Sequence, residues 1–199
     1  MSAELPVFSI VAMATITASL ITAICSFVSL TLTKEQKISE FRQAWIDALR
    51  EDLSIFFACS RAFARATEEE FIFSENSENK NRFKISSEKV SEVRYQVAEV
   101  YSRIILRLNV DEPEHEELLR LLAIAIEKQN IAIREKSNSA ETMKAIQIAT
   151  NYSRPLLKIE WDRVKKGEPA FRSAKTAAAG LMIFLCIALA SFVIYGSFK

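Results

Sequence analysis

Charge is nearly absent from both ends of this 199-residue chain and is concentrated in its middle. From Met1 to Thr33 the only charged side chain is Glu4, and from Thr176 onward the only one is Lys199. The segment 34–175 therefore holds 25 of the 26 basic residues and 24 of the 25 acidic residues. Two uncharged ends around a highly charged centre restrict the chain to few architectures.

Each uncharged end is long enough for a transmembrane helix, which needs about 20 mostly apolar residues. The segments 7–32 and 176–198 meet that length and contain no charge, which in the bilayer centre costs several kcal/mol. The alternatives are a buried core helix for either segment and a signal peptide for the first. A signal peptide has a basic start and a shorter apolar run, of about 7–15 residues, whereas this chain has Glu4 and a longer run.

We therefore predict transmembrane helices at 1–33 and 176–199, with a separate domain at 34–175 between them. Basic residues flanking a span stay on the cytoplasmic side. The flanks of the middle domain are rich in them: Lys34, Lys37, Arg42, Lys158, Arg163, Lys165, Lys166, Arg172 and Lys175. This places the protein in a bacterial inner membrane, with the middle domain in the cytoplasm and both termini outside.

The middle domain has the apolar periodicity of amphipathic helices, with steps of three and four residues. In the first helix the apolar stripe consists of Ile38, Phe41, Trp45, Ala48, Leu49, Leu53, Phe56, Phe57 and Phe63. In the later helices the periodic positions are Val90, Val93, Val97, Val100, Ile104, Leu119, Leu122, Ile126, Ile133, Met143, Ile146, Ala149, Leu156, Leu157 and Val164. The first helix extends to about Phe73, and the sequence leaves open whether it is continuous with the first span; a polar loop follows at 74–82. A second helix has Ser87 as its N-cap, a third has Pro113 in its first turn, and a fourth starts near Ser139. Pro155 predicts a kink or break in the fourth helix. The expected fold is all-α, an antiparallel four-helix bundle between two spans.

One face of the first span carries hydroxyl groups at steps of three and four residues. The hydroxyl stripe consists of Thr15, Ser19, Thr22, Ser26 and Ser29, and the same spacing continues to Thr33. Small and hydroxyl residues let membrane helices pack closely, so the stripe can pack against the second span or a second copy of the chain. The alternative is a water-filled path in an oligomer. We predict transmembrane packing or pore lining for these residues.

Signatures of catalysis are missing from the sequence. The single histidine, His115, lies among acidic residues and is expected on the surface, and no His/Cys set has zinc-ligand spacing. There is no Gly-rich phosphate loop and no nucleophile elbow. The cysteines Cys25, Cys59 and Cys186 do not suggest a disulfide framework. We predict a protein that is not an enzyme, with no catalytic, cofactor-binding or metal-binding residues.

Three stretches carry a resemblance: KISEFRQAWIDALREDLS at 37–54, ILRLNVDEPEHEELL at 105–119 and LKIEWDRVKKGE at 157–168. They cover under half of the middle domain. In this order they resemble segments of poorly characterised two-span bacterial membrane proteins, some of which resemble effectors of retron-type anti-phage systems. The resemblance implies a non-enzymatic effector of anti-phage defence that oligomerises and permeabilises the membrane, which stops infection at the cost of the host cell.

The partners expected on this interpretation are membrane lipid, further copies of the chain and a cytoplasmic regulatory partner, either protein or nucleoprotein, with no small-molecule substrate. The alternative is a membrane-tethered adaptor whose bundle recruits a protein. A sensor of the chemoreceptor type is a third option, but such proteins place the helical domain outside, against the charge pattern found here.

Overall fold

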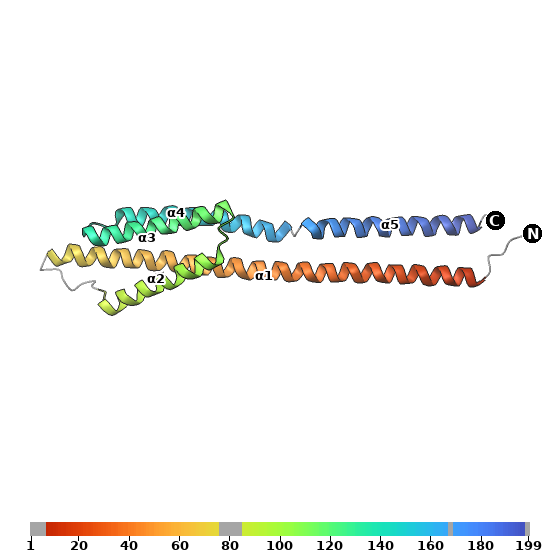
Figure 1. Cartoon of the computed structure of the whole chain (residues 1–199), viewed down its shortest axis with the longest axis horizontal. Coiled ribbons are helices and arrows are strands. Elements are labelled where there is room, and N and C mark those ends of the chain that lie inside the picture. Colours follow the sequence, from red (N-terminus) through yellow and green to blue (C-terminus); the bar gives the residue numbers. More distant parts are fainter. Residues whose placement is uncertain (1–6, 76–84, 167–168, 198–199) are drawn as a thin grey trace, which may run out of the picture. The chain divides into compact units, whose positions relative to one another are not determined.

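The computed structural model describes residues 7–75, 85–166 and 169–197, and every element in these ranges is helical. The helices are α1 (Val7–Glu75), α2 (Ser87–Arg107), α3 (Pro113–Glu135), α4 (Ala140–Lys166) and α5 (Pro169–Ser197) (Figure 1). The described residues contain no strand. The prediction of an all-α protein is confirmed.

The chain divides into two compact units. The central unit is Gln43–Asp162, and the terminal unit combines Met1–Arg42 with Arg163–Lys199. The flanks 34–42 and 163–175, which the charge pattern assigned to the middle domain, thus group with the two ends. Helix α1 contributes to both units, so the first apolar segment and the first amphipathic segment are one helix.

Four helices share the hydrophobic core of the central unit. The buried residues come from α1, α2, α3 and α4, and Leu108 adds to them directly after α2. They are Leu49, Leu53, Phe56, Phe57, Val97, Val100, Ile104, Leu108, Leu118, Leu122, Ala125, Ala145, Ile146, Ala149 and Leu156. Most were expected from the three- and four-residue periodicity, because that spacing puts side chains on one face of a helix.

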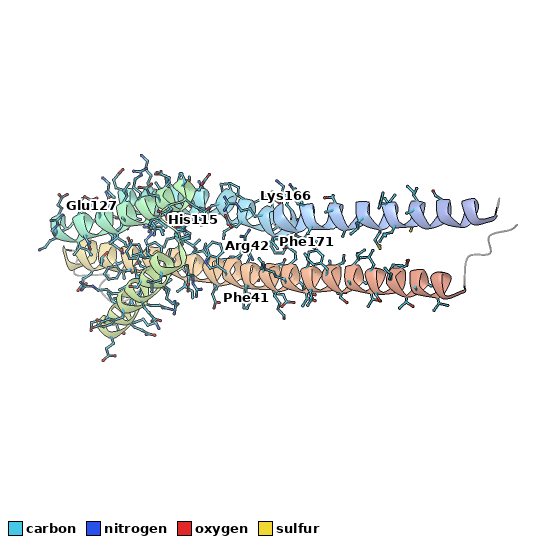
Figure 2. The ribbon with its side chains drawn as sticks, turned by 45° about the vertical axis from the view of Figure 1, so that its right-hand side comes forward. Phe41, Arg42, His115, Glu127, Lys166 and Phe171 are labelled. Carbon is cyan, nitrogen blue, oxygen red and sulfur yellow. The ribbon has the colours of Figure 1, made fainter. Side chains whose placement is uncertain are left out.

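Phe41 is an exception to the expected apolar stripe. It follows the same spacing as Trp45 and Leu49 but is exposed, and it lies in the terminal unit rather than the central one (Figure 2). Phe41 is not among the buried residues of the hydrophobic core. Periodicity alone identifies the apolar face of a helix, not how far along the helix a partner extends.

Polar contacts tie α2 to α1 within the central unit. The Asp52 carboxylate is buried and accepts hydrogen bonds from Arg103 Nε at 3.0 Å and from Arg107 Nε at 2.6 Å. The Trp45 indole N–H donates to the Arg107 carbonyl oxygen at 3.0 Å. A buried carboxylate with two guanidinium partners is satisfied, which is the condition for tolerating such a charge inside a fold.

Further contacts tie α1 to the α3–α4 pair. Arg61 Nη2 donates to Thr150 Oγ1 at 2.9 Å, and the Ser139 hydroxyl donates to a Glu68 oxygen at 2.5 Å. Gln129, buried on α3, donates to the Ser60 carbonyl oxygen at 3.4 Å. Together with the α2 contacts, these bonds define which faces of the four segments meet.

The helix ends match the sequence signals closely, with small shifts. The N-cap of α2 is Ser86, whose hydroxyl accepts from the Lys89 amide at 3.3 Å, rather than Ser87. Helix α3 begins at Pro113 as predicted and ends at Lys136, which has a left-handed backbone with φ of 49°. Of the predicted loop 74–82, the first two residues are still helical, and the remainder lies outside the described residues.

Pro155 does not break α4, which is helical from Ala140 to Lys166. The break expected there is therefore wrong. A proline in a helix leaves a carbonyl one turn earlier without its usual amide partner. Side chains contribute hydrogen bonds in this turn, where the Ser153 hydroxyl donates to the Thr150 carbonyl oxygen at 2.8 Å.

Two helical stretches are long and apolar enough to cross a membrane, one starting at Ala14 in α1 and one reaching Ala188 in α5. Only 6% of the apolar stretch in α1 and 0% of that in α5 is buried within the protein. The core helix of a globular domain would be largely buried, because its apolar face must leave water. The second span expected at 176–199 corresponds to the greater part of α5.

Candidate functional site

The hydroxyl stripe lies on the exposed side of α1. All five of its residues are exposed within the terminal unit. Thr15 Oγ1 donates to the Val11 carbonyl oxygen at 2.9 Å, Ser19 Oγ to that of Thr15 at 2.9 Å, and Thr22 Oγ1 to that of Ala18 at 2.8 Å. A hydroxyl that bonds to its own helix four residues back has satisfied its hydrogen and can lie in an apolar surrounding.

The stripe hydroxyls can still accept a hydrogen bond. A hydroxyl has one hydrogen to donate and two lone pairs to accept with, so donation to the backbone leaves its oxygen able to accept. On an exposed helix face these oxygens can accept from water or from a donor on another helix. The stripe is thus a row of weak acceptors on an otherwise apolar surface.

A different face of α1 meets α5. An open crevice between the two helices has about 340 Å³ of empty space and is lined by Phe27, Val28, Thr31 and Leu32 of α1 and by Phe171, Ala174 and Lys175 of α5. Phe171 lies on the side of α5 toward α1 (Figure 2). Ile24, one turn before Val28, is buried. The side of α1 toward α5 is therefore mainly apolar.

The two faces of α1 lie almost opposite each other. At about 100° per residue, the hydroxyl stripe is roughly 140–180° around the helix from Ile24. The second span was one of two partners considered for the stripe. In the terminal unit, however, the stripe residues are exposed and lie on the side of α1 away from the residues that line the crevice with α5.

His115 forms a second polar centre, in the central unit. The expectation that it is a surface residue is wrong, because only 3% of it is exposed (Figure 2). Its ring lies 5.8 Å from that of Trp45, centre to centre, and its Nδ1 accepts a hydrogen bond from the Asn109 amide at 3.2 Å. Pro113 starts α3 two residues earlier, so His115 lies in the first turn and turns inward onto α1 and α4.

Two carboxylates lie close to the His115 ring. His115 Nε2 is 4.0 Å from Glu160 Oε1, and Glu160 itself is only 5% exposed. Glu112, directly before α3, brings a third potential ligand, and the three ligand atoms all lie within 4.8 Å of one another. The sequence could not reveal this group, because Glu160 is on a different helix, far along the chain. Only the Glu112–His115 spacing was a local signal.

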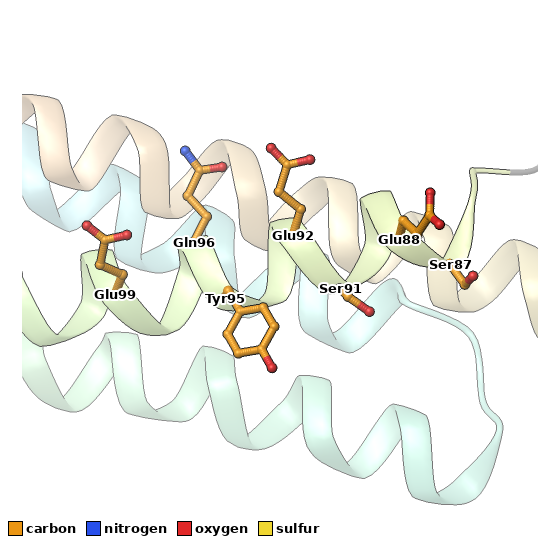
Figure 3. Close-up of a pocket in the computed structure, with 7 residues that line it drawn as sticks. All are labelled: Ser87, Glu88, Ser91, Glu92, Tyr95, Gln96 and Glu99. Carbon is orange, nitrogen blue, oxygen red and sulfur yellow. The ribbon is translucent and has the colours of Figure 1, made fainter.

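Helix α2 carries an open groove in the central unit. It is lined by Ser87, Glu88, Ser91, Glu92, Tyr95, Gln96 and Glu99, all on one helix (Figure 3). Glu92 pairs with Lys89 at 2.7 Å, and Glu99 pairs with Arg103 at 2.7 Å. The lining residues are thus mainly serines, glutamates and a tyrosine of one helix, and two of the glutamates are held in ion pairs on that helix.

Cys59 is the cysteine of the central unit, and its surroundings make it a poor nucleophile. Its thiol donates to Gln96 Oε1 at 3.2 Å, and burial raises the pKa of the Cys59 thiol above its usual value. The reactive form of cysteine is the thiolate, so a raised pKa lowers the reactive fraction at neutral pH. Cys59 is therefore mainly in its thiol form at neutral pH.

The features that stand out are thus an outward hydroxyl stripe in the terminal unit and a buried histidine with two carboxylates in the central unit. Comparisons with protein-family models, with curated proteins and with solved structures each find no match to this chain.

Proposed function

We propose that the protein is a non-enzymatic membrane effector that oligomerises through α1 and permeabilises a bacterial inner membrane. The observation that carries the proposal is the outward position of the hydroxyl stripe, nearly opposite the side of α1 that lines the crevice with α5. A transmembrane helix pair that leaves a stripe of small hydroxyl residues outward is suited to associate with further copies in lipid.

The proposed topology has α1 and α5 as two transmembrane helices around a cytoplasmic four-helix bundle, with both termini outside. It is supported by the apolar, unburied stretches of α1 and α5 and by the basic residues flanking them. The bundle would bind a cytoplasmic regulatory partner, protein or nucleoprotein, that keeps the effector inactive. The role in anti-phage defence rests on the resemblance of three sequence segments to two-span effectors.

The test is induction of the protein alone in bacteria, with membrane potential and dye entry as readouts. We expect rapid depolarisation from the natural chain. The triple variant Ser19→Leu, Thr22→Leu and Ser26→Leu should insert normally but fail to depolarise, because bulky side chains block close approach and remove the acceptors. Unchanged depolarisation by this variant would refute the role of the hydroxyl stripe.

A matched control enlarges small side chains of the same helix that lie outside the stripe. The triple variant Ala14→Leu, Ala23→Leu and Cys25→Leu adds comparable bulk at exposed positions without touching the hydroxyl stripe. It should depolarise like the natural chain. Equal loss of activity in both triple variants would mean that general disturbance of the span, and not the stripe, explains the effect.

A gentler triple variant separates packing from pore lining. Ser19→Ala, Thr22→Val and Ser26→Ala remove the hydroxyls and keep the side-chain size nearly constant. If the stripe acts by close packing, the oligomer and the depolarisation persist. If the hydroxyls line a water-filled path, the oligomer still forms but ion flow falls. The reason is that a narrow path lined by apolar side chains loses its water.

The adaptor function is the second candidate, favoured by the exposed apolar residues of α2. Tyr95 and Leu106 are 78% and 87% exposed and lie on the outward side of α2. Exposed aromatic and aliphatic side chains on one helix face can serve as an interaction surface. Replacing both spans with unrelated transmembrane anchors distinguishes the functions: an adaptor keeps its activity after the exchange, whereas the effector loses it.

A further inference from the structure

We propose that Glu112, His115 and Glu160 form a binding site for a divalent transition-metal ion in the central unit. The three side chains come from the start of α3 and from the C-terminal half of α4. Their ligand atoms lie within 4.8 Å of one another, and His115 and Glu160 are both buried. The site is separate from the hydroxyl stripe and goes beyond the proposed function.

The imidazole of His115 provides the second, independent observation. Its Nε2 is buried and has no hydrogen-bond partner, and it points toward the Glu160 carboxylate at 4.0 Å, too far for a hydrogen bond. Buried polar atoms are nearly always satisfied by protein, water or an ion. A cation between Nε2 and the carboxylates binds the Nε2 lone pair once the ring hydrogen lies on Nδ1, and it attracts both carboxylates.

The ligand chemistry indicates which cations fit. One imidazole nitrogen with two carboxylates suits zinc, and also manganese, iron or cobalt, whereas calcium and magnesium prefer sites made of oxygen ligands alone. Metal–ligand bonds of about 2.0–2.2 Å for nitrogen and carboxylate oxygen require the 4.0 Å separation of Nε2 and Oε1 to shorten slightly.

Metal binding also moves a proton within the His115 ring. Because Nδ1 accepts the Asn109 amide hydrogen, the neutral ring carries its own hydrogen on Nε2. A metal ion can bind Nε2 only if this nitrogen has a free lone pair. The hydrogen on Nε2 must therefore move to Nδ1, which leaves the net charge of the ring unchanged. Nδ1 can then no longer accept from Asn109. Metal binding is therefore linked to release of the Asn109 amide at the α2–α3 connection.

The experiment uses the full chain in detergent, freed of metal with a chelator and titrated with Zn²⁺ by calorimetry and with Co²⁺ by visible absorption. We expect an equimolar complex and the absorption bands of cobalt bound to nitrogen and oxygen. Hydrogen exchange at the Asn109 amide should become faster when Zn²⁺ is bound. Absence of an equimolar complex with either ion would overturn the proposal.

The decisive variant is His115→Asn, because an asparagine oxygen can still accept the Asn109 amide hydrogen while Nε2 is lost. It should fold with unchanged helix content and lose the equimolar complex. Glu160→Gln replaces the carboxylate by an amide of the same size and should also weaken metal binding. It is the variant to test if His115→Asn fails to fold. Glu116→Gln, an exposed neighbour on α3, is the matched control and should bind like the natural chain. Binding that survives both His115→Asn and Glu160→Gln would overturn the site.

Discussion

Helix α1 presents leucines in two different surroundings along its length. In the central unit Leu53 is 2% exposed, covered by helices of the same chain, whereas in the terminal unit Leu30 is 72% exposed. The same residue type in the same helix is thus hidden in one region and uncovered in the other. The difference teaches that helix formation and burial are decided separately in this molecule.

The reason lies in how apolar residues are distributed around the helix. In the central unit they form one stripe with charged residues beside it, which directs a helix to bury that stripe against partners. In the apolar stretch of the terminal unit, uncharged and mostly apolar residues occur all round the helix, which is the pattern of a helix that needs an apolar solvent. A set of paired substitutions can test this contrast.

The largest effect is expected for Leu53→Ala compared with Leu30→Ala. Leu53→Ala should lower the free energy of unfolding of the central unit by about 2–5 kcal/mol, because it leaves a cavity in a packed core. Leu30→Ala should change it by less than about 0.5 kcal/mol, as exposed positions usually do. Denaturant unfolding of the full chain in detergent, followed by tryptophan fluorescence, measures both. Equal losses would mean that the two regions are stabilised in the same way.

A smaller loss is expected for the buried carboxylate of Asp52. Asp52→Asn should lower the free energy of unfolding by about 2 kcal/mol, because hydrogen bonds to charged groups contribute more than neutral ones. The control is Asp47→Asn on the same helix, where the exposed pair with Arg50 at 2.8 Å contributes little. A loss from Asp47→Asn as large as that from Asp52→Asn would contradict the assignment of the effect to burial.

Removing the indole donor of Trp45 should have a still smaller effect. Trp45→Phe keeps an aromatic ring beside His115 but loses the bond to the Arg107 carbonyl oxygen, for a cost of about 1 kcal/mol. Differential scanning calorimetry of the full chain can detect the change. If Trp45→Phe leaves the free energy of unfolding unchanged, the indole N–H bonds to water in the unfolded chain as favourably as to this carbonyl oxygen in the folded one.

The smallest effect concerns one exposed ion pair in each region. Hydrogen bonds from Lys37 and from Arg120 hold the pKa values of Glu40 and Glu117 below their usual 4.5. A lowered folded-state pKa adds stability above pH 4.5 that is lost as the pH falls through the folded value. Lys37→Gln should raise the pKa of Glu40 toward its usual 4.5, and Arg120→Gln should do the same for Glu117. NMR titration measures both pKa values. No upward shift in either variant would refute the pairing.

Local signals predicted the helices well. Pro113 starts α3 and a serine caps α2 because these residues act through the first helical turn alone. Pro155 was misleading, since the surrounding helix continues in spite of the missing amide hydrogen. The loss of one hydrogen bond is small beside the burial of Leu156 and Ala149 on the same helix. Tertiary packing here overrides a local helix-breaking signal.

The sequence alone determined the separation of charge, the helical character and the two stretches that are long and apolar enough to cross a membrane. These follow from composition and from spacings within a few residues, and such features act locally. Only the tertiary structure decided that α5 lies toward the Ile24 side of α1, leaving the hydroxyl stripe outward, and that His115 meets Glu160 in the interior. Both depend on contacts between residues far apart in the chain, and periodicity in one segment carries no information about which other segment will face it.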